Sequence, residues 1–226
     1  VFACGSVDKD DVLRWAEENF DPMSGGRPNP RKAPVLTGSA YRYYKRKGDH
    51  CYVGMGFRAF DANDDDLPAL TMLNAVLGSG SSSRLFQNVR EEKALVYSIY
   101  NYVDQYTDAG SMGTYMSATE ENVLDAIETT ARTYRELKDG GLTDGELQRV
   151  KNLVKGALIR GMESTSRRLY TLAKGTMLVG KPRSLEERLS RLDAVTEEDV
   201  MRVAEKVIRP EGLNVVMYSD DVASLK

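Results

Sequence analysis

Histidine is almost absent from this 226-residue chain, since His50 is the only one. A catalytic zinc commonly takes three protein ligands, often two of them histidines, and keeps a fourth position for water. Asp49 and Cys51 do not complete such a site, because consecutive strand residues point to opposite faces of a sheet. The shortage of histidine also removes the usual general base for a serine or cysteine nucleophile. We expect no catalytic and no metal-binding residue here, and we interpret His50 as a solvated or hydrogen-bonded strand residue.

Cysteine, long apolar runs and excess basic charge are scarce as well. Cys4 and Cys51 are too few for a disulfide framework and fit buried thiols in a reducing compartment. No apolar run approaches the roughly 20 residues that span a bilayer, and no amino-terminal signal pattern is visible. A formal net charge of -3 gives no basic excess for nucleic acid. We therefore expect a cytoplasmic protein with neither a nucleic-acid nor a membrane partner.

The start of the chain predicts a domain boundary. The first residue is Val1, which favours a processed product or a piece of a longer protein, so an upstream targeting signal would not be visible. Residues 1–22 predict a short strand, a turn and a helix that need a partner sheet, because a lone helix of this length is marginal in water. Residues 23–40 are rich in proline and glycine and predict a linker. Residues 41–226 then form the main domain.

The main domain predicts strands first, then helices, then one more strand. Two strand-like runs in 41–60, separated by "KGD", predict a hairpin, and "DDDLPALTMLNAVLG" predicts a helix ending at Gly78. A shorter helix over 84–94 precedes strands over 95–103 and 110–116. The expected caps of the later helices are Thr119, Thr143 with Glu146, Ser184 with Glu187, and Thr196 with Glu198 or Asp199. With the final strand "GLNVVMY", this order predicts an α+β fold, a mainly antiparallel sheet with helices packed on one face.

Two glycine-rich segments resemble phosphate-binding loops only superficially. "GTMLVGKP" at 175–182 has the G-x-x-x-x-G-K frame, but Pro182 stands where such a loop carries Ser or Thr. The segment also follows a helix, so we interpret Gly180 as a helix carboxyl cap. "GSGSSS" at 78–83 lacks a third fingerprint glycine and predicts a linker between helices. Paired catalytic carboxylates stay an alternative, although most acids here precede helices or lie on charged faces.

Three ordered segments carry a family resemblance that covers about residues 41–218. These are "GSGSSSRLFQNVREEKALVYSIYNYVDQYTDAGSMGTYMSATEENV", "LTDGELQRVKNLVKGALIRGMESTSRRLYTLA" and "LDAVTEEDVMRVAEKVIRPEGLNVVMY". They resemble the carboxyl-terminal half of the insulinase/pitrilysin zinc metallopeptidases, which include the mitochondrial processing peptidases. The H-x-x-E-H motif of the catalytic half is absent. The opening 1–22 is similar to the last strand and helix of that preceding, catalytic half.

The resemblance implies one half of a clamshell that closes around an extended peptide. The zinc would lie in an upstream or separate partner half, and this chain would hold no cofactor of its own. The family's non-zinc half supplies an arginine and a tyrosine seven residues apart, and Arg90 and Tyr97 match that spacing. The resemblance therefore implies that both residues bind substrate.

Other interpretations stay open at this point. Arg90 can instead pair with Glu91, Glu92 or another carboxylate, and Tyr97 can be an ordinary amphipathic strand residue. The whole chain can be a structural scaffold of the same fold without peptidase activity, as relatives in respiratory complexes are. A nucleotide-binding module resting on "GTMLVGKP" is the weakest alternative.

Overall fold

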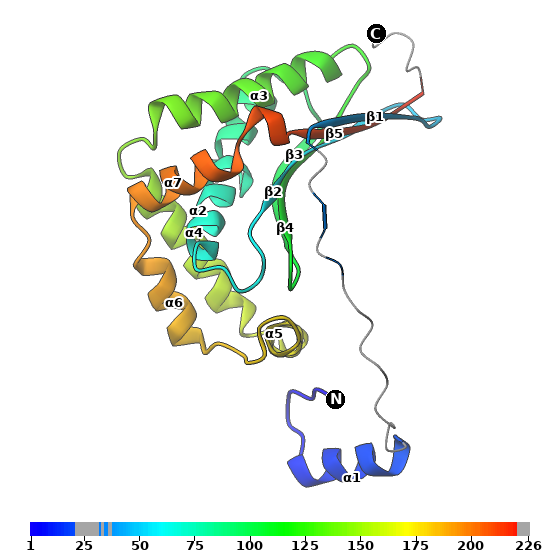
Figure 1. The fold of residues 1–226 in the computed structure, drawn as a ribbon, viewed down its shortest axis with the longest axis vertical. Helices are drawn as coiled ribbons and strands as arrows, with labels where there is room; N and C mark the ends of the chain where they lie inside the picture. The colour runs from blue at the N-terminus through cyan, green and yellow to red at the C-terminus, as the bar shows by residue number, and fades with distance from the viewer. Residues whose placement is uncertain (21–31, 33, 36–37, 221–226) are drawn as a thin grey trace.

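The computed structural model describes residues 1–20, 32, 34–35 and 38–220, so most of the predicted linker lies outside the described residues. Within the described part, helices cover one face of a five-stranded sheet (Figure 1). The strands are β1 (Ala40–Lys45), β2 (Cys51–Ala59), β3 (Ser98–Gln105), β4 (Gly110–Ala118) and β5 (Asn214–Ser219). The α-helices are α1 (Lys9–Asn19), α2 (Leu67–Gly78), α3 (Val123–Gly140), α4 (Glu146–Gly161), α5 (Thr165–Val179), α6 (Leu185–Asp193) and α7 (Glu197–Val207), with a π-helix η1 (Phe86–Glu91) and a 3-10 turn η2 (Pro210–Gly212). The predicted α+β fold with a mainly antiparallel sheet is confirmed.

The strand order β1-β5-β2-β4-β3 corrects one prediction. β5 lies between β1 and β2, pairing parallel with β1 and antiparallel with β2, so the hairpin predicted over 41–60 is wrong. β1 is almost wholly exposed, whereas β5 places Val215 and Met217 in the core. A polar, charged strand is suited to the edge of a sheet, and the more apolar β5 takes the inner position.

The core lies between the helix-facing side of the sheet and α2. Nine of the twelve α2 residues are buried, and Leu73 and Leu77 pack in one cluster with Met55 of β2 and Met116 of β4. At the end of α2 a Cβ on Gly78 would lie 2.3 Å from the Asn101 backbone nitrogen of β3. Only glycine permits this close approach of a helix to a strand.

The helix starts follow the predicted capping residues only in part. Ser184 accepts a hydrogen bond from the Glu187 N–H, and Thr196 with Asp199 forms a capping box. The predictions for Thr119 and Thr143 are wrong, because Asn122 and Gly145 stand at the helix starts. Gly145 takes this position with a left-handed φ of 70°.

Two predicted elements differ because they lack a packing surface. Residues 1–8 form no strand in the described structure, since a strand needs a hydrogen-bonded neighbour, whereas the helix after them is present as α1. No residue of α1 is buried. The sequence also predicts an apolar helix face formed by Leu169, Leu172 and Met177. In the structure this face of α5 is not part of the core, because none of the α5 residues is buried and Met177 is 72% exposed.

A buried ion pair fixes the segment that follows α2. Arg84 donates from Nε and Nη2 to the two carboxylate oxygens of Glu146, at 3.0 and 2.6 Å, and also donates to the Gly141 carbonyl at 2.7 Å. Thr143 adds a bond from its N–H at 2.9 Å and one from its hydroxyl at 3.2 Å. Burial raises the pKa of Glu146, but the bonds from Arg84 and Thr143 outweigh it, so the pKa lies below its ordinary value.

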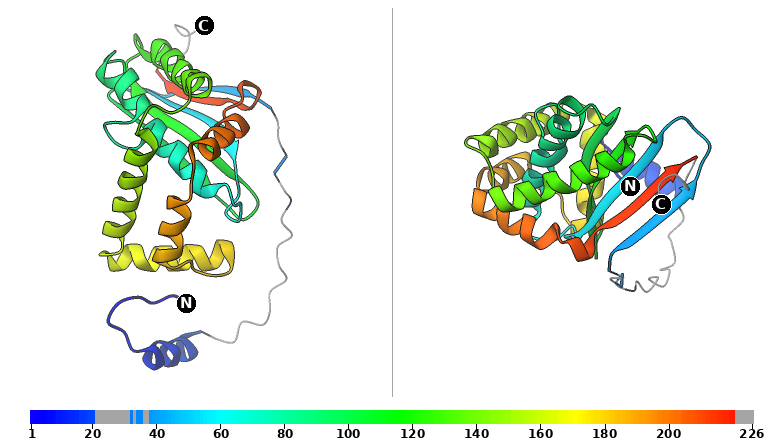
Figure 2. Two further views of the ribbon diagram at one scale, coloured as in Figure 1. Left: turned by 90° about the vertical axis from the view of Figure 1, so that its left-hand side faces the viewer. Right: turned by 90° about the horizontal axis from the view of Figure 1, so that it is seen from above.

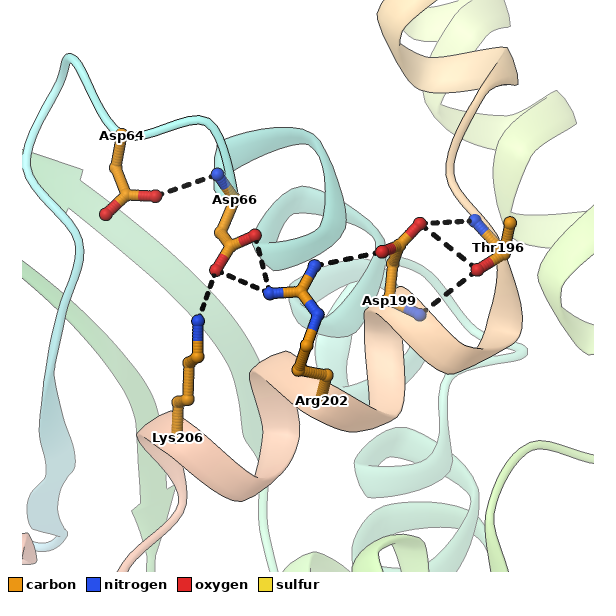
Figure 3. Close-up of polar contacts among 6 residues, drawn as sticks. All are labelled: Asp64, Asp66, Thr196, Asp199, Arg202 and Lys206. Atoms are coloured by element: carbon orange, nitrogen blue, oxygen red, sulfur yellow. Dashed lines mark hydrogen bonds and ion pairs between the residues drawn. The ribbon is translucent and has the colours of Figure 1, made fainter.

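A second network joins α7 to the entry of α2 (Figure 3). Asp66 accepts hydrogen bonds from Arg202 at 2.7 and 2.8 Å and from Lys206 at 2.8 Å. Arg202 also donates to Asp199 of the capping box at 2.9 Å. Burial raises the pKa of Asp66, but the bonds from Lys206 and Arg202 outweigh it and lower the pKa below its usual value.

None of the described helices is long and apolar enough to cross a membrane. The predicted domain limits 1–22, 23–40 and 41–226 and the cytoplasmic location stay predictions.

Replacing Glu146 by Ala should lower the free energy of unfolding by about 3–5 kcal/mol, because the substitution leaves the Arg84 guanidinium buried without its counter-charge. Glu128→Ala, at an exposed α3 position, should change it by less than about 0.5 kcal/mol. The pair Arg84→Met with Glu146→Leu should recover much of the loss. Urea denaturation monitored by circular dichroism measures all three variants. Equal losses of unfolding free energy for Glu146→Ala and Glu128→Ala would show that the ion pair between Arg84 and Glu146 does not stabilise the fold.

Asp66→Asn should lower the free energy of unfolding by about 1 kcal/mol at pH 7, a modest loss because the Asp66 network is partly exposed. The loss should be much smaller at pH 3. A carboxylate whose folded pKa is lowered stabilises the fold above its unfolded pKa of about 3.8, and this contribution disappears as the pH falls through the folded pKa. Denaturation of wild type and variant at both pH values measures the difference. Asp65→Asn, at the fully exposed neighbour, is the matched control. A cost that is the same at both pH values would rule out Asp66 ionisation as its source.

Candidate functional site

The candidate site begins where η1 turns into β3. Asn88 of η1 donates to the Thr133 hydroxyl of α3 at 3.1 Å, and Val89 is buried below the helix. After η1 the chain reverses through two bonds, from the Ala94 N–H to the Arg90 carbonyl (3.1 Å) and from the Leu95 N–H to the Val89 carbonyl (3.0 Å). The first bond, with Ala94 in a left-handed conformation, is the pattern of an αL helix end. A fixed turn therefore separates the two residues that the sequence singles out.

Ala94 adopts a left-handed conformation at this turn, with φ of 51°. It is the one such non-glycine residue in the described part of the chain, and a left-handed alanine costs roughly 1–2 kcal/mol. Short stretches of π-helix such as η1 are frequently found at functional sites. The strained Ala94 thus lies between Arg90 and Tyr97, and the π-helix η1 ends just before it.

Arg90 is exposed, and its guanidinium carbon lies 4.9 Å from the centroid of the Phe86 ring. This cation–π contact orients the side chain without using its N–H donors. Neither Glu91 nor Glu92 forms an ion pair with it, and no other described carboxylate does. The predicted competing interpretation, a local ion pair, is therefore not what the described structure contains. All five guanidinium N–H groups stay available to a ligand.

Tyr97 is 76% exposed and stands just before β3. Its backbone N–H donates to the Ser117 carbonyl of β4 at 2.8 Å, which fixes the residue in line with the sheet. Its hydroxyl has no hydrogen-bond partner among the described residues. The ring stacks against His50, with centroids 6.4 Å apart and an interplanar angle of 24°.

The contact between His50 and Tyr97 is a feature that sequence reasoning missed. His50 is exposed in the bend before β2 and does not lie in the strand, which corrects the prediction of a strand histidine. The two residues meet because β4 pairs with both β2 and β3, aligning Cys51 with Ala118 and Ser98 with Ser117. No local sequence signal carries this register.

A row of tyrosines lies across the open face of the sheet. The ring pairs along it are Tyr100–Tyr115 at 5.1 Å, Tyr52–Tyr115 at 6.4 Å and Tyr44–Tyr218 at 5.2 Å. Together they span all five strands. Burial, followed by the neighbouring Asp104, raises the pKa of Tyr102, and burial also raises the pKa of Tyr115. Both hydroxyls therefore stay protonated hydrogen-bond donors at neutral pH.

The described residues offer few metal ligands. Over the described ranges, no group of three or more His, Cys, Asp or Glu side chains could hold an ion. Cys51 is buried and Cys4 is partly buried, and both are free thiols. The metal-ligating side chains among the described residues therefore do not fit a zinc site.

The glycine-rich segments behave as expected from their helical context. Gly180 ends α5 with φ of 82°, and its N–H donates to the Thr176 carbonyl at 3.0 Å. The carboxyl end of a helix repels anions, so this turn is not a phosphate-binding loop. Ser83, at the end of "GSGSSS", donates to the Gly80 carbonyl at 2.7 Å in a turn that leads from α2 towards η1.

Comparison with known sequences gives the family. A sequence model of a protein family, described as the peptidase M16 inactive domain, matches residues 1–154. The chain is 32% identical over 213 residues to a protein named as an uncharacterized zinc protease from Mycobacterium tuberculosis strain H37Rv, a match that covers 92% of this chain and 49% of that protein. The chain thus spans about half the length of the curated relatives it matches.

Solved structures agree at the level of the fold. A protease from Helicobacter pylori superposes with a TM-score of 0.83 at 20% identity, covering 96% of this chain and 54% of that one. A chain of complex III from Candida albicans gives a TM-score of 0.82 at 19% identity, covering 97% and 54%. The resemblance to the insulinase/pitrilysin peptidases is confirmed, and this chain belongs to the peptidase M16 family, whose inactive domain it matches.

Proposed function

We propose that this chain is the substrate-binding, non-catalytic half of a zinc-dependent endopeptidase. It would complete a chamber for an extended peptide together with a half that carries the H-x-x-E-H motif, the zinc and the general base. That partner half is either upstream in the same polypeptide or a separate subunit. The observation that carries the proposal is a pair of exposed, unengaged donors, Arg90 and Tyr97, on an inactive M16 domain without a metal-binding group among its described residues.

The exposure of α1 supports a partner half. Trp15 and Phe20 stack edge-to-face at 5.7 Å, yet both are about half exposed. Such apolar surface is normally buried by another element. A preceding half that packs on α1 would cover it, as the assignment of residues 1–22 to that half requires.

Tyr97 would act on the oxygen of the scissile carbonyl. Peptide hydrolysis places negative charge on that oxygen, and a phenol positioned to donate to it stabilises the charge. Removal of one donor of this kind costs about 2.7–4 kcal/mol. The His50 ring and the Ser117 carbonyl hold Tyr97 in place, while its hydroxyl stays free for the substrate.

Arg90 would anchor a neighbouring carbonyl of the same peptide. Hydrogen bonds from a charged donor contribute about 1.5–3 kcal/mol each, about twice the value for neutral groups. The Phe86 ring restrains the guanidinium, which reduces the conformational entropy lost on binding. Arg90 therefore positions the peptide, and Tyr97 acts nearer the reacting bond.

The scaffold function is kept as the second candidate because of one observation, the close similarity in fold to a chain of complex III. A scaffold subunit would use the same open sheet face to bind another protein permanently. It would not need free donors at positions 90 and 97. Activity measurements on the assembled protein separate the two functions.

Hydrolysis of a quenched fluorescent peptide should appear only when this chain is joined or mixed with its H-x-x-E-H half. This chain alone should be inactive, since it has one histidine and no described metal group. Treatment of the assembled enzyme with a zinc chelator should abolish the activity. Hydrolysis by this chain alone would mean that it holds an unrecognised active site. No hydrolysis by the assembled protein would favour the scaffold.

In the assembled enzyme, Tyr97→Phe should lower kcat by about 10²–10³-fold. Arg90→Ala should lower kcat/KM by roughly 10–150-fold, the equivalent of the 1.5–3 kcal/mol given above. Both side chains are exposed, so the melting temperature should change little. Steady-state kinetics on each variant measure the effect.

The matched controls are Tyr106→Phe and Arg135→Ala, which change exposed residues outside the turn. Both should keep wild-type kinetics. Unchanged turnover in Tyr97→Phe and Arg90→Ala would remove the assignment of the two residues.

A further inference from the structure

Helix α5 crosses the ends of α4 and α6 at one end of the domain (Figure 2). A basic cavity is lined by residues of these three helices. It has a volume of about 410 Å³, within the usual range of sites for small molecules. The amino-terminal end of α2 closes it on another side. The cavity lies away from Arg90 and Tyr97, since neither of them lines it.

The lining of the cavity combines positive charge with apolar surface. Its cationic side chains are Lys174, Lys181, Arg183, Arg188 and Arg191, and none of its lining residues is acidic. Leu67, Val154, Leu158 and Leu178 supply apolar walls. Lys181 belongs to the "GTMLVGKP" segment, so this segment contributes a cation to the cavity from a helix end and not from a phosphate-binding loop.

Counter-charges neutralise only part of this cluster. Arg183 pairs with Glu187 at 3.5 Å, and Arg191 pairs with Asp65 at 3.3 Å, both carboxylates lying outside the lining. Lys174, Lys181 and Arg188 have no ion pair with any residue whose position is described. The cavity thus carries an excess of positive charge inside a chain whose formal net charge is -3.

Arg188 is the least compensated of these cations. Its Nη1 atom is buried and has no hydrogen-bond partner in the described structure. Burial, followed by repulsion from Arg183, lowers the pKa of its guanidinium. An arginine keeps its charge in proteins, so a partly buried guanidinium without a counter-charge destabilises the fold, and an anion in the neighbouring cavity compensates this charge.

We propose that this cavity binds a small organic anion, a carboxylate or phosphate group joined to a short apolar body. Arg188, which lines the cavity, would face the anionic group with its guanidinium, with Lys174 and Lys181 adding positive charge. The apolar part would contact Leu67, Val154 and Leu178. Arginine suits this task because its planar donors match the oxygens of a carboxylate or phosphate.

The test is calorimetric titration of the intact protein that carries this chain, with butyl phosphate, hexanoate, inorganic phosphate and butanol. Butyl phosphate or hexanoate should bind saturably with one site per chain, and whichever binds more tightly identifies the anionic group. Inorganic phosphate should bind at least tenfold more weakly, since it lacks the apolar body, and butanol should not bind. Absence of saturable binding for both organic anions up to millimolar concentration would overturn the proposal.

Two variants place the binding in the cavity. Arg188→Met should reduce the affinity ten- to hundredfold, and Leu178→Trp, which fills the apolar part, should also weaken binding at least tenfold. Arg135→Met, at an exposed α3 position outside the cavity, should bind as wild type does. Circular dichroism checks that each variant is folded. Binding that survives either cavity variant would overturn the proposal.

A second readout separates a ligand site from a purely structural arginine. In anion-free buffer, Arg188→Met should raise the melting temperature, because a partly buried cation without a counter-charge is removed. The same variant should lose the stabilisation that the anion gives to wild type. A melting temperature that falls in Arg188→Met, together with an unchanged response to the anion, would show that Arg188 serves only the fold.

Discussion

The candidate site depends on the buried ion pair between Arg84 and Glu146. Arg84 stands two residues before η1, and Glu146 is the first residue of α4, so the pair fixes the start of η1 against the helical layer. The other end of the segment 84–97 is fixed by the turn at Ala94 and by the hydrogen bond from the Tyr97 N–H to the Ser117 carbonyl. A short segment held at both ends can present exposed side chains in one geometry. Rigid support of this kind is what a binding site needs from residues that do not touch the substrate.

The fold was predictable from the sequence where local signals decide it. Helix α2 and the caps at Ser184 and Thr196 follow from short-range patterns, and the structure has them. The position of β5 between β1 and β2 was not predictable, because it pairs residues 158 to 174 positions apart in the chain and no turn sequence encodes that choice. Glu146 shows a related limit. It was expected at a helix start, but its role as a buried partner of Arg84 depends on tertiary packing.

The candidate site was predictable in its residues and not in its geometry. Arg90 and Tyr97 came from the family resemblance, since one arginine and one tyrosine seven residues apart carry little information alone. Their positions depend on the Phe86 ring beside Arg90, on the left-handed turn at Ala94 and on the His50 ring beside Tyr97. Each of these features requires the folded turn or the strand register. The tyrosine row across the open face is another case. Its members lie in five strands, and only the order of those strands makes them neighbours.

The two faces of the domain present opposite chemistry, and this division supports two separate binding tasks. The open sheet face offers neutral phenol donors and exposed rings, which can hold an extended peptide through its backbone with little preference for charge. The helical side instead holds a small cavity with unpaired cations, which suits a compact anion and excludes a chain of peptide length. A peptide on the sheet face and an anion in the cavity would not compete, because neither Arg90 nor Tyr97 lines the cavity. Binding at the cavity can influence the peptide face through α2, whose first turn lines the cavity and whose last residue, Gly78, contacts β3. It can also act through β3 directly, because Gln105 at the end of that strand lines the cavity.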